Sequence, residues 1–253
     1  MISLKSPREI DIMRRANIIV AEVLQELKQT VAPGVTTLEL DAVAEDLTLR
    51  RKAIPAFKGY SVAGRVFPRC LCVSINEEIV HGIPSNRALR EGDIVGLDYG
   101  VIYDGFYGDS AVTVGVGKVS EEAKRLMEVT EQALYRGIEQ LQDGKRLGDL
   151  GFAVQQTAES AGYSVVRAFV GHGIGKKLHE EPPVPNYGEP DRGVRLKEGM
   201  VLAIEPMVNA GSYEVEIKED GWTAITKDGS LAAHFEHSVA VTKNGPFILS
   251  KLS

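Results

Sequence analysis

The sequence predicts an α+β fold in which two pseudo-symmetric halves each hold two helices followed by strands. Three observations predict it. Helical patterns with N-terminal caps open residues 1–117 and residues 118–253 alike, and short strand and turn patterns follow in each half. Leu, Arg or Lys, Glu and Gly precede an apolar run and an acid once per half, so Asp98 and Glu205 end matching strands. We therefore expect one domain over residues 1–253, with outer helices on a curved sheet and a site on its inner face.

The first half is expected to open with two capped helices. Ser6 and Glu9 form a capping box that starts a helix ending near Gln29. Thr36 and Glu39 repeat the capping pattern after a Pro-Gly break and start the second helix. The apolar residues at helical spacing are Ile10, Met13, Ala16, Val20, Val23 and Leu24 in the first helix and Leu40, Val43, Ala44 and Leu47 in the second.

The second half opens in the same way. Ser120 caps a long helix whose apolar residues fit a 3.6-residue period, and a second helix is expected from about Leu147 to Ala161. Strands and loops should then continue from Ser164 to the end of the chain. No low-complexity linker separates the halves, so we expect them to pack together.

The stretch Leu89 to Ser110 predicts a β-hairpin that carries two acids. Asp104-Gly105 lies between two β-rich runs, a strong signal for a two-residue turn. If those two residues are the whole loop, Gly100 faces Asp109, and Asp98 lies diagonally from Asp109 on the same face. Diagonal neighbours are roughly 7–8 Å apart, and their carboxylates can converge on a pair of cations about 3.5–4 Å apart. The alternative from the hairpin alone is that both acids are solvated on an exposed face.

The histidines lie in motifs rich in glycine or carboxylate. His81-Gly82-Ile83 is echoed by His172-Gly173-Ile174, and His179 follows seven residues later, so that a loop between the two is needed to bring them to one face. Several carboxylates around one imidazole repel one another without cations and attract Mn, Fe, Co or Zn. This chemistry suits hydrolysis but leaves peptide and phosphoester substrates both open. The candidate ligands are Asp98, Asp109, His172, Glu205 and Glu236.

Bulk properties exclude several other classes of protein. A net charge of −6 and a pI near 5.5 are unlike a nucleic-acid binder. No apolar run approaches the ~20 residues of a membrane span, and the N-terminus does not read as a signal peptide. Cys70 and Cys72 are too close in an extended segment to form an unstrained disulfide, so we expect reduced thiols in a cytoplasmic protein. A Cys-x-Cys metal site is the disfavoured alternative, since no second thiol pair completes it.

Taken together, the motifs resemble those of type I methionine aminopeptidases, a peptidase family with the pita-bread (creatinase/aminopeptidase) fold. That fold has two αα-β halves with outer helices on a curved, mainly antiparallel sheet. The resemblance covers nearly the whole chain. It is carried by SPREIDIMR, PGVTTLELD, CVSINEEIVHGIPS, LREGDIVGLDYGVIYDGFYGDSAVT, VGHGIGKKLHEEPPVPNYG, LKEGMVLAIEPM and DGWTAITKDGSLAAHFEHSVAVT.

The resemblance implies a single catalytic domain that holds two divalent metal ions (Co, Mn, Fe or Zn). Their ligands would be Asp98, Asp109, His172, Glu205 and Glu236, with Asp109 and Glu236 bridging. A metal-bridging hydroxide would attack the first peptide bond, and Glu205 would handle its proton. Such enzymes remove the initiator methionine from nascent proteins with a small second residue.

The resemblance also assigns roles to the remaining site residues. His179 would stabilise the oxygen of the tetrahedral intermediate, and His81 would contact the amide nitrogen of the scissile bond. The substrate's α-amine would bind near the metal held by Asp98. The pocket for the methionine side chain would be formed by Tyr60, Cys72 and Trp222 with Phe57 and Leu178, the last two at positions where some relatives carry Tyr and Phe.

Two features depart from the family pattern. The segment Ser61 to Arg69 is longer than the matching loop of some bacterial relatives. We interpret it as a surface excursion, the alternative being that it reshapes the pocket rim. His234 stands where many members carry Gln, and it either adds a hydrogen bond near Glu236 or has no measurable effect.

The expected partners are the N-termini of nascent polypeptides, with a possible transient ribosome contact and no nucleic-acid specificity, for a protein that is a monomer and binds no membrane. One competing interpretation is a proline-specific aminopeptidase or prolidase, although such enzymes carry an additional N-terminal domain. Another is a non-enzymatic binding protein of the same fold, although such proteins tend to lose metal ligands.

Overall fold

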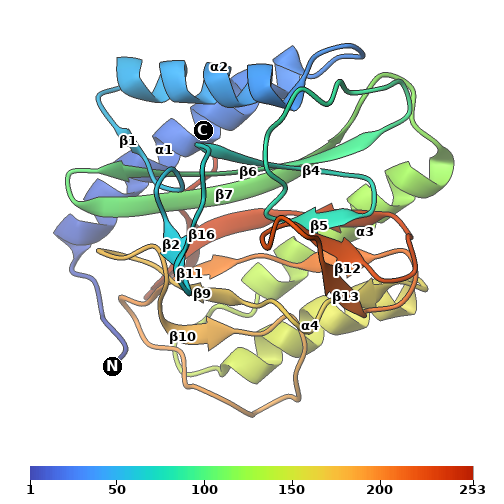
Figure 1. Ribbon diagram of the computed structural model, residues 1–253. Helices are drawn as coiled ribbons and strands as arrows, with labels where there is room; N and C mark the ends of the chain where they lie inside the picture. The colour runs from blue at the N-terminus through green and yellow to red at the C-terminus, as the bar shows by residue number, and fades with distance from the viewer. Residues whose placement is uncertain (253) are drawn as a thin grey trace.

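The helices form where the capping patterns predict them in the computed structural model, which describes residues 1–252 (Figure 1). Ser6 and Thr36 each accept a hydrogen bond from the backbone three residues on, and both capping boxes are complete. Ser120 caps the third helix through Ala123. The helices within these residues are α1 (Pro7–Thr30), α2 (Thr37–Arg50), α3 (Glu121–Ile138) and α4 (Leu147–Ser160).

Strands from both halves of the chain form one nine-stranded sheet, and every pairing in it is antiparallel. The two halves meet where β7 pairs with β16. The strands along the sheet are β1 (Ile54–Pro55), β6 (Ile94–Tyr103), β7 (Phe106–Gly115), β16 (Glu236–Thr242), β11 (Val201–Ile204), β9 (Gly171–Gly173) and β10 (Glu180–Val184), while β4 (Leu71–Ile75) pairs with β6 and β17 (Gly245–Ile248) with β16.

Three smaller sheets lie beside the main one. The first is β15 (Ala232–His234), β12 (Met207–Asn209) and β8 (Ser164–Val165). The second is β13 (Val215–Ile217), β14 (Ala224–Thr226) and β5 (Glu78–Val80). The third is the hairpin of β2 (Ser61–Val62) and β3 (Arg65–Val66).

The helices pack on one face of the main sheet. In Figure 1, α1 and α2 lie along β6 and β7, and they share a core with Leu97 and Tyr99. Helices α3 and α4 share a second core with β11 and β16. Because side chains alternate along a strand, Asp98 points to the opposite face from Leu97 and Tyr99. The prediction of helices outside a curved, antiparallel sheet is confirmed.

The predicted hairpin has the expected register. Asp104 and Gly105 form the turn with φ of +47° and +78°, and Gly100 pairs with Asp109. Asp98 pairs with Ala111, which places both acids on one face of the sheet, with one residue pair between them. Among residues 1–252, no helix is both long and apolar enough to cross a membrane.

Candidate metal centre

One cavity of about 130 Å³ brings together all of the predicted site residues. The alternative that both hairpin acids are solvated on an exposed face is wrong, since Asp109 is 4% exposed and Asp98 is half-buried. The residues that line the cavity are Phe57, Tyr60, Val62, Phe67, Cys72, His81, Asp98, Asp109, His172, Leu178, His179, Glu205, Trp222 and Glu236.

Glycines make room for the acid on β7. A Cβ built on Gly100, directly opposite Asp109, would lie 2.8 Å from the Phe57 ring and 3.2 Å from Asp109 Oδ1. Gly108 lets α1 approach, because a Cβ there would lie 2.8 Å from the α1 backbone. Asn17 of α1 in turn accepts a hydrogen bond from the Asp109 backbone N–H at 3.2 Å. The position of this carboxylate is therefore fixed by β6 on one side and by α1 on the other.

Strand β16, which carries Glu236, is hydrogen-bonded to β7, which carries Asp109. Ser110 Oγ donates to the Glu236 carbonyl at 2.6 Å, and Ser238 Oγ donates to the Asp109 carbonyl at 2.9 Å. These bonds cross the β7–β16 pairing, where Glu236 lies opposite Ala111. Asp109 and Glu236, which come from different halves of the chain, are thus held side by side.

His172 presents the nitrogen that a metal would need. Its Nδ1 lies 2.9 Å from the Gly173 carbonyl, an acceptor, so Nδ1 carries the hydrogen and Nε2 keeps its lone pair. Nε2 lies 3.5 Å from Glu205 Oε1 and 3.9 Å from Asp109 Oδ2. Burial lowers the pKa of His172 to about 3, which keeps the imidazole neutral at physiological pH.

The carboxylates are in an environment that disfavours their charge. Burial raises the pKa of Asp98 to about 7. Burial, followed by repulsion from neighbouring acids, raises the pKa values of Asp109, Glu205 and Glu236 well above their usual range. These acids destabilise one another's charged forms, and bound cations would stabilise them.

Unpaired ligand atoms give a direct test of whether a metal fits. Within residues 1–252, Asp109 Oδ1 and Glu236 Oε1 are buried and have no hydrogen-bond partner. One ligand atom each of Asp109, His172 and Glu236 lies within 4.8 Å of the others. Carboxylate oxygens with one imidazole nitrogen are a donor set for Mn, Fe, Co or Zn. The residues present therefore fit a metal centre.

His81 and His179 flank the acids from two loops. His81 follows β5 with a φ of +62°, and its ring packs edge-on against Phe169 at 5.5 Å. Burial lowers the pKa of His81 to about 4. The His179 ring lies 4.3 Å from the ring of His172, because the loop between β9 and β10 brings the two together.

His179 is oriented by a hydroxyl group. Tyr60 Oη lies 2.5 Å from His179 Nδ1. When the Tyr60 hydroxyl donates, Nδ1 accepts and Nε2 carries the hydrogen. His179 is exposed at the mouth of the cavity, yet desolvation by the cavity wall lowers its pKa. The site thus holds a neutral imidazole that is able to donate from Nε2.

The remaining wall of the cavity is apolar. Phe57, Cys72, Leu178 and Phe67 are buried in one cluster, with Trp222 packed against them. Burial raises the pKa of the Cys72 thiol, so it stays protonated and acts as a small apolar group. Cys70 and Cys72 are both free, as expected. A hydrocarbon or thioether side chain fits this end of the cavity.

The interpretation of Ser61 to Arg69 as a surface excursion is wrong for two of its residues. Phe67 is 2% exposed and stacks edge-on against Trp222 at 5.3 Å, while Val62 lines the cavity although it is 50% exposed. Sequence reasoning missed both residues, because two-residue strands have no periodicity to detect. The one local signal was Ala63-Gly64 at the turn, with φ of +49° and +81°.

His234 lies beside another proposed ligand, Glu205. Its Nε2 is 3.7 Å from Glu205 Oε2. Within residues 1–252 this buried nitrogen has no hydrogen-bond partner. Burial lowers the pKa of His234 to about 3, and its imidazole is therefore neutral.

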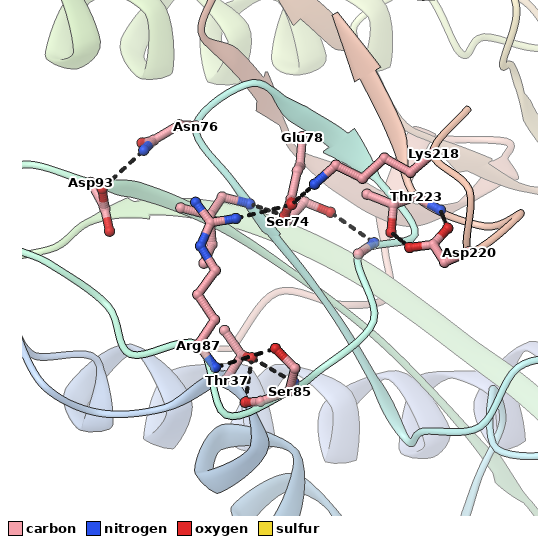
Figure 2. Close-up of polar contacts among 12 residues, drawn as sticks. Thr37, Ser74, Asn76, Glu78, Ser85, Arg87, Asp93, Lys218, Asp220 and Thr223 are labelled. Atoms are coloured by element: carbon pink, nitrogen blue, oxygen red, sulfur yellow. Dashed lines mark hydrogen bonds and ion pairs between the residues drawn. The ribbon is translucent and has the colours of Figure 1, made fainter. Parts of the chain in front are cut away.

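A buried polar network supports the segment that carries His81 (Figure 2). Glu78 of β5 accepts hydrogen bonds from Lys218 at 2.5 Å and from Arg87 at 3.0 Å. Its second oxygen accepts from the Ile75 backbone N–H at 2.9 Å. The Glu78 side chain is 8% exposed. These bonds join β5 to two other segments immediately before the chain turns at His81.

Comparison with known proteins places this geometry in context. The sequence profile of metallopeptidase family M24 matches residues 11–243. The chain is 52% identical to the methionine aminopeptidase of Clostridium perfringens over 250 residues, covering 99% of both chains. Its structure resembles the crystal structure of methionine aminopeptidase from Thermotoga maritima, with a TM-score of 0.97, 46% identity and 100% of both chains covered. The prolidase of Pyrococcus horikoshii is more distant, with a TM-score of 0.76, 25% identity and only 64% of that chain covered.

Proposed function

The chain belongs to metallopeptidase family M24 and, within it, to the methionine aminopeptidases with the pita-bread fold, and we propose how its cavity removes the initiator methionine from protein N-termini. One observation carries the proposal. A buried group of Asp109, His172 and Glu236 lies at one end of a cavity whose other end is apolar. The first end suits hydrolysis, and the second suits a methionine side chain.

Two divalent ions are proposed to be held by Asp98, Asp109, His172, Glu205 and Glu236. The orphaned oxygens of Asp109 and Glu236 support this assignment, because they would be free to hold an ion. When bound, such ions polarise a carbonyl oxygen and lower the pKa of water, which is the chemistry that peptide hydrolysis needs. Co, Mn, Fe and Zn all suit this donor set.

Glu205 is proposed to move the proton of the attacking water. Its carboxylate lies between His172 and His234, at 3.5 Å and 3.7 Å from their Nε2 atoms. Burial raises its pKa, so that it accepts a proton more readily than an exposed glutamate does. His234 supports this role because its neutral imidazole can donate a hydrogen bond to Glu205 and hold its orientation.

His179 is proposed to stabilise the negative charge that develops on the carbonyl oxygen. The Tyr60 hydroxyl leaves a hydrogen on His179 Nε2, and a fixed neutral donor is favourable for an oxyanion. His81 is proposed to contact the amide nitrogen of the scissile bond. Its low pKa leaves one ring nitrogen free to accept a hydrogen bond from that amide.

The substrate is proposed to enter with its methionine side chain among Phe57, Tyr60, Phe67, Cys72, Leu178 and Trp222. Sulfur packs favourably against aromatic edges, and four of these side chains are aromatic. The α-amine would then lie near Asp98. A small second residue is proposed from the family resemblance.

The two halves are proposed to act as a single catalytic domain, because β7 and β16 pair across them and each half supplies ligands. The buried free thiols support a reducing, cytoplasmic location. The monomeric state stays a prediction. A transient ribosome contact, through which the protein would meet nascent chains, also stays a prediction.

The test uses metal-stripped protein titrated with Mn, Co, Fe or Zn. We expect turnover of Met-Ala-Ser, but not of Xaa-Pro peptides, that rises with up to two ions per chain. Cleavage of Xaa-Pro peptides instead would favour a prolidase, and metal binding without any turnover would favour a binding protein.

A further inference from the structure

A second hollow borders the cavity at His81. This groove has a volume of about 480 Å³, and it shares Val62, His81 and Trp222 with the cavity that holds the proposed ligands. The groove and the cavity are therefore adjacent, and His81 lies at the boundary between them. Of the residues that line the groove, only His81 and Trp222 have been given a role above.

One wall of the groove is the β2–β3 hairpin. Val62 pairs with Arg65, and Ser61 pairs with Val66. Because paired residues share a face, Val62 and Arg65 point to one side and Ser61 and Val66 to the other. Val62 and Arg65 line the groove, whereas Val66 does not. The hairpin thus presents one defined face to the groove.

The opposite wall is the turn between β13 and β14, and the two walls are cross-linked. Arg65 Nη1 donates to the Gly221 carbonyl at 3.0 Å. The guanidinium fills the space beside Gly221, since a Cβ there would lie 2.8 Å from it. On its inner side the same turn is anchored by Lys218, which donates to buried Glu78 (Figure 2). Both walls are therefore held in place without a ligand.

The lining between these walls is apolar although it is open to solvent. Ile217 and Val62 are each 50% exposed, and Phe169 and Trp222 are half-buried beside them. Arg65, Lys218 and Glu219 add charged groups to the lining. A solvent-open lining that combines apolar and charged side chains suits an extended peptide.

A second opening beside the metal-ligand group has a different character. It is lined by Lys176, Lys177, Glu180 and Glu181 around His172 and His179. Lys5 pairs with Glu180 at 2.7 Å, so part of that surface is already occupied by an ion pair. His81 is proposed to contact the scissile amide, so the groove beside His81 is the opening that leads away from that amide.

We propose that the groove binds the part of the substrate polypeptide that follows the scissile bond and favours apolar side chains at the fourth and fifth residues. This inference rests on the proposed function, since it takes the enclosed cavity as the site of the N-terminal methionine. The occupant is an extended peptide, because the groove runs between the hairpin face and the edge strand β13. The hairpin is then a determinant of specificity.

The test compares kcat/KM for three peptides, Met-Ala-Ser, Met-Ala-Ser-Leu-Leu and Met-Ala-Ser-Asn-Asn, on the metal-loaded enzyme. We expect the Leu-Leu peptide to exceed the Asn-Asn peptide by about five- to tenfold, as partial burial of aliphatic side chains implies, and mainly through KM. Ile217→Ser should bring this ratio close to one and leave Met-Ala-Ser within about twofold of the wild type. Val66→Ser, on the other face of the hairpin, is the matched control and should keep the ratio.

The outcomes separate the two proposals. Absence of Met-Ala-Ser cleavage by the wild type would overturn the proposed function and the groove with it. Cleavage of Met-Ala-Ser with equal rates for the two pentapeptides would overturn the groove alone, as would a Val66→Ser variant that loses as much as Ile217→Ser. Arg65→Ala, which cuts the cross-link between the walls, gives a second route to the same loss of the ratio. Circular dichroism verifies that each variant is folded.

Discussion

Replacement of Asp109 by Asn is the sharpest test of the metal centre. Four carboxylates (Asp98, Asp109, Glu205 and Glu236) line the cavity, and their four negative charges when ionised match the charge of two divalent cations. The Asp109→Asn change keeps the shape of the side chain and leaves one positive charge without a partner in a buried site. Breaking a buried ion pair costs about 3–5 kcal/mol. At about 1.4 kcal/mol per tenfold, metal should bind about one hundred to a few thousand times more weakly.

The assay is isothermal titration of metal-stripped protein with Mn²⁺, together with hydrolysis of Met-Ala-Ser. Asp104→Asn is the matched control, because this residue is exposed at the turn of the same hairpin, where Asn also accepts a positive φ. We expect the control to bind metal and to turn over substrate like the wild type. Near-normal metal affinity and activity in Asp109→Asn would refute the ligand assignment.

The same substitution should have the opposite effect on the metal-free protein. Burial raises the pKa of Asp109, so its ionised form destabilises the fold at pH values above the unfolded pKa of about 4. An acid with a raised folded pKa binds protons more tightly in the native state, and its cost therefore disappears as the pH falls towards 4. Metal-free Asp109→Asn should melt at a higher temperature than metal-free wild type at pH 7.5, and this gain should vanish at low pH. A lower melting temperature at pH 7.5 would mean that the carboxylate stabilises the fold by itself.

Three further outcomes are expected. His179→Ala should keep its metal content while kcat falls about 100-fold or more, as for loss of one oxyanion donor, and loss of metal in this variant would make His179 a ligand. Metal binding should release protons, and metal affinity should weaken as the pH falls from 8 to 6. Burial raises the pKa of Asp98 to about 7, so metal must displace the bound proton. A constant affinity over this range in titration calorimetry would contradict a protonated metal-free site. Gly82→Ala should lower the free energy of unfolding in urea by at least about 2 kcal/mol, as overpacking does, since its Cβ would lie 2.1 Å from the Val73 carbonyl oxygen, and an unchanged midpoint would show that this backbone can move.

Local sequence rules predicted the parts of the site that lie on regular elements. Alternation along a strand and the requirements of a two-residue turn fix which residues of a hairpin face one another. For that reason the pairing of Gly100 with Asp109 was accessible from the sequence, and the structure has it. The capping boxes at Ser6 and Thr36 are equally local, because the two partners of each are three residues apart.

Non-local features were not accessible in this way. The approach of His179 to His172 depends on the path of a glycine-containing loop, for which many backbone dihedrals are open. Glu78 meets Arg87 and Lys218, and the last of these lies 140 residues away, so that no periodic pattern joins them. Phe67 and Val62 belong to a hairpin whose strands are two residues long. In each case the deciding contact is tertiary, and only the folded chain reveals it.

The arrangement of the proposed ligands ties the chemistry of the site to the pairing of the two halves of the sheet. Asp98 and Asp109 come from the first half, while His172, Glu205 and Glu236 come from the second. The ionised carboxylates are unfavourable in the buried cavity. Without metal they therefore oppose the pairing of β7 with β16. Hydrogen bonds from serine hydroxyls join β7 to β16 and offset part of that repulsion. Because unfolded halves cannot present all five groups together, cations that bind here bind only the assembled sheet and therefore stabilise it. The pairing of β7 with β16, which the charged carboxylates disfavour without metal, is thus also the feature that brings the proposed ligands of the two halves together.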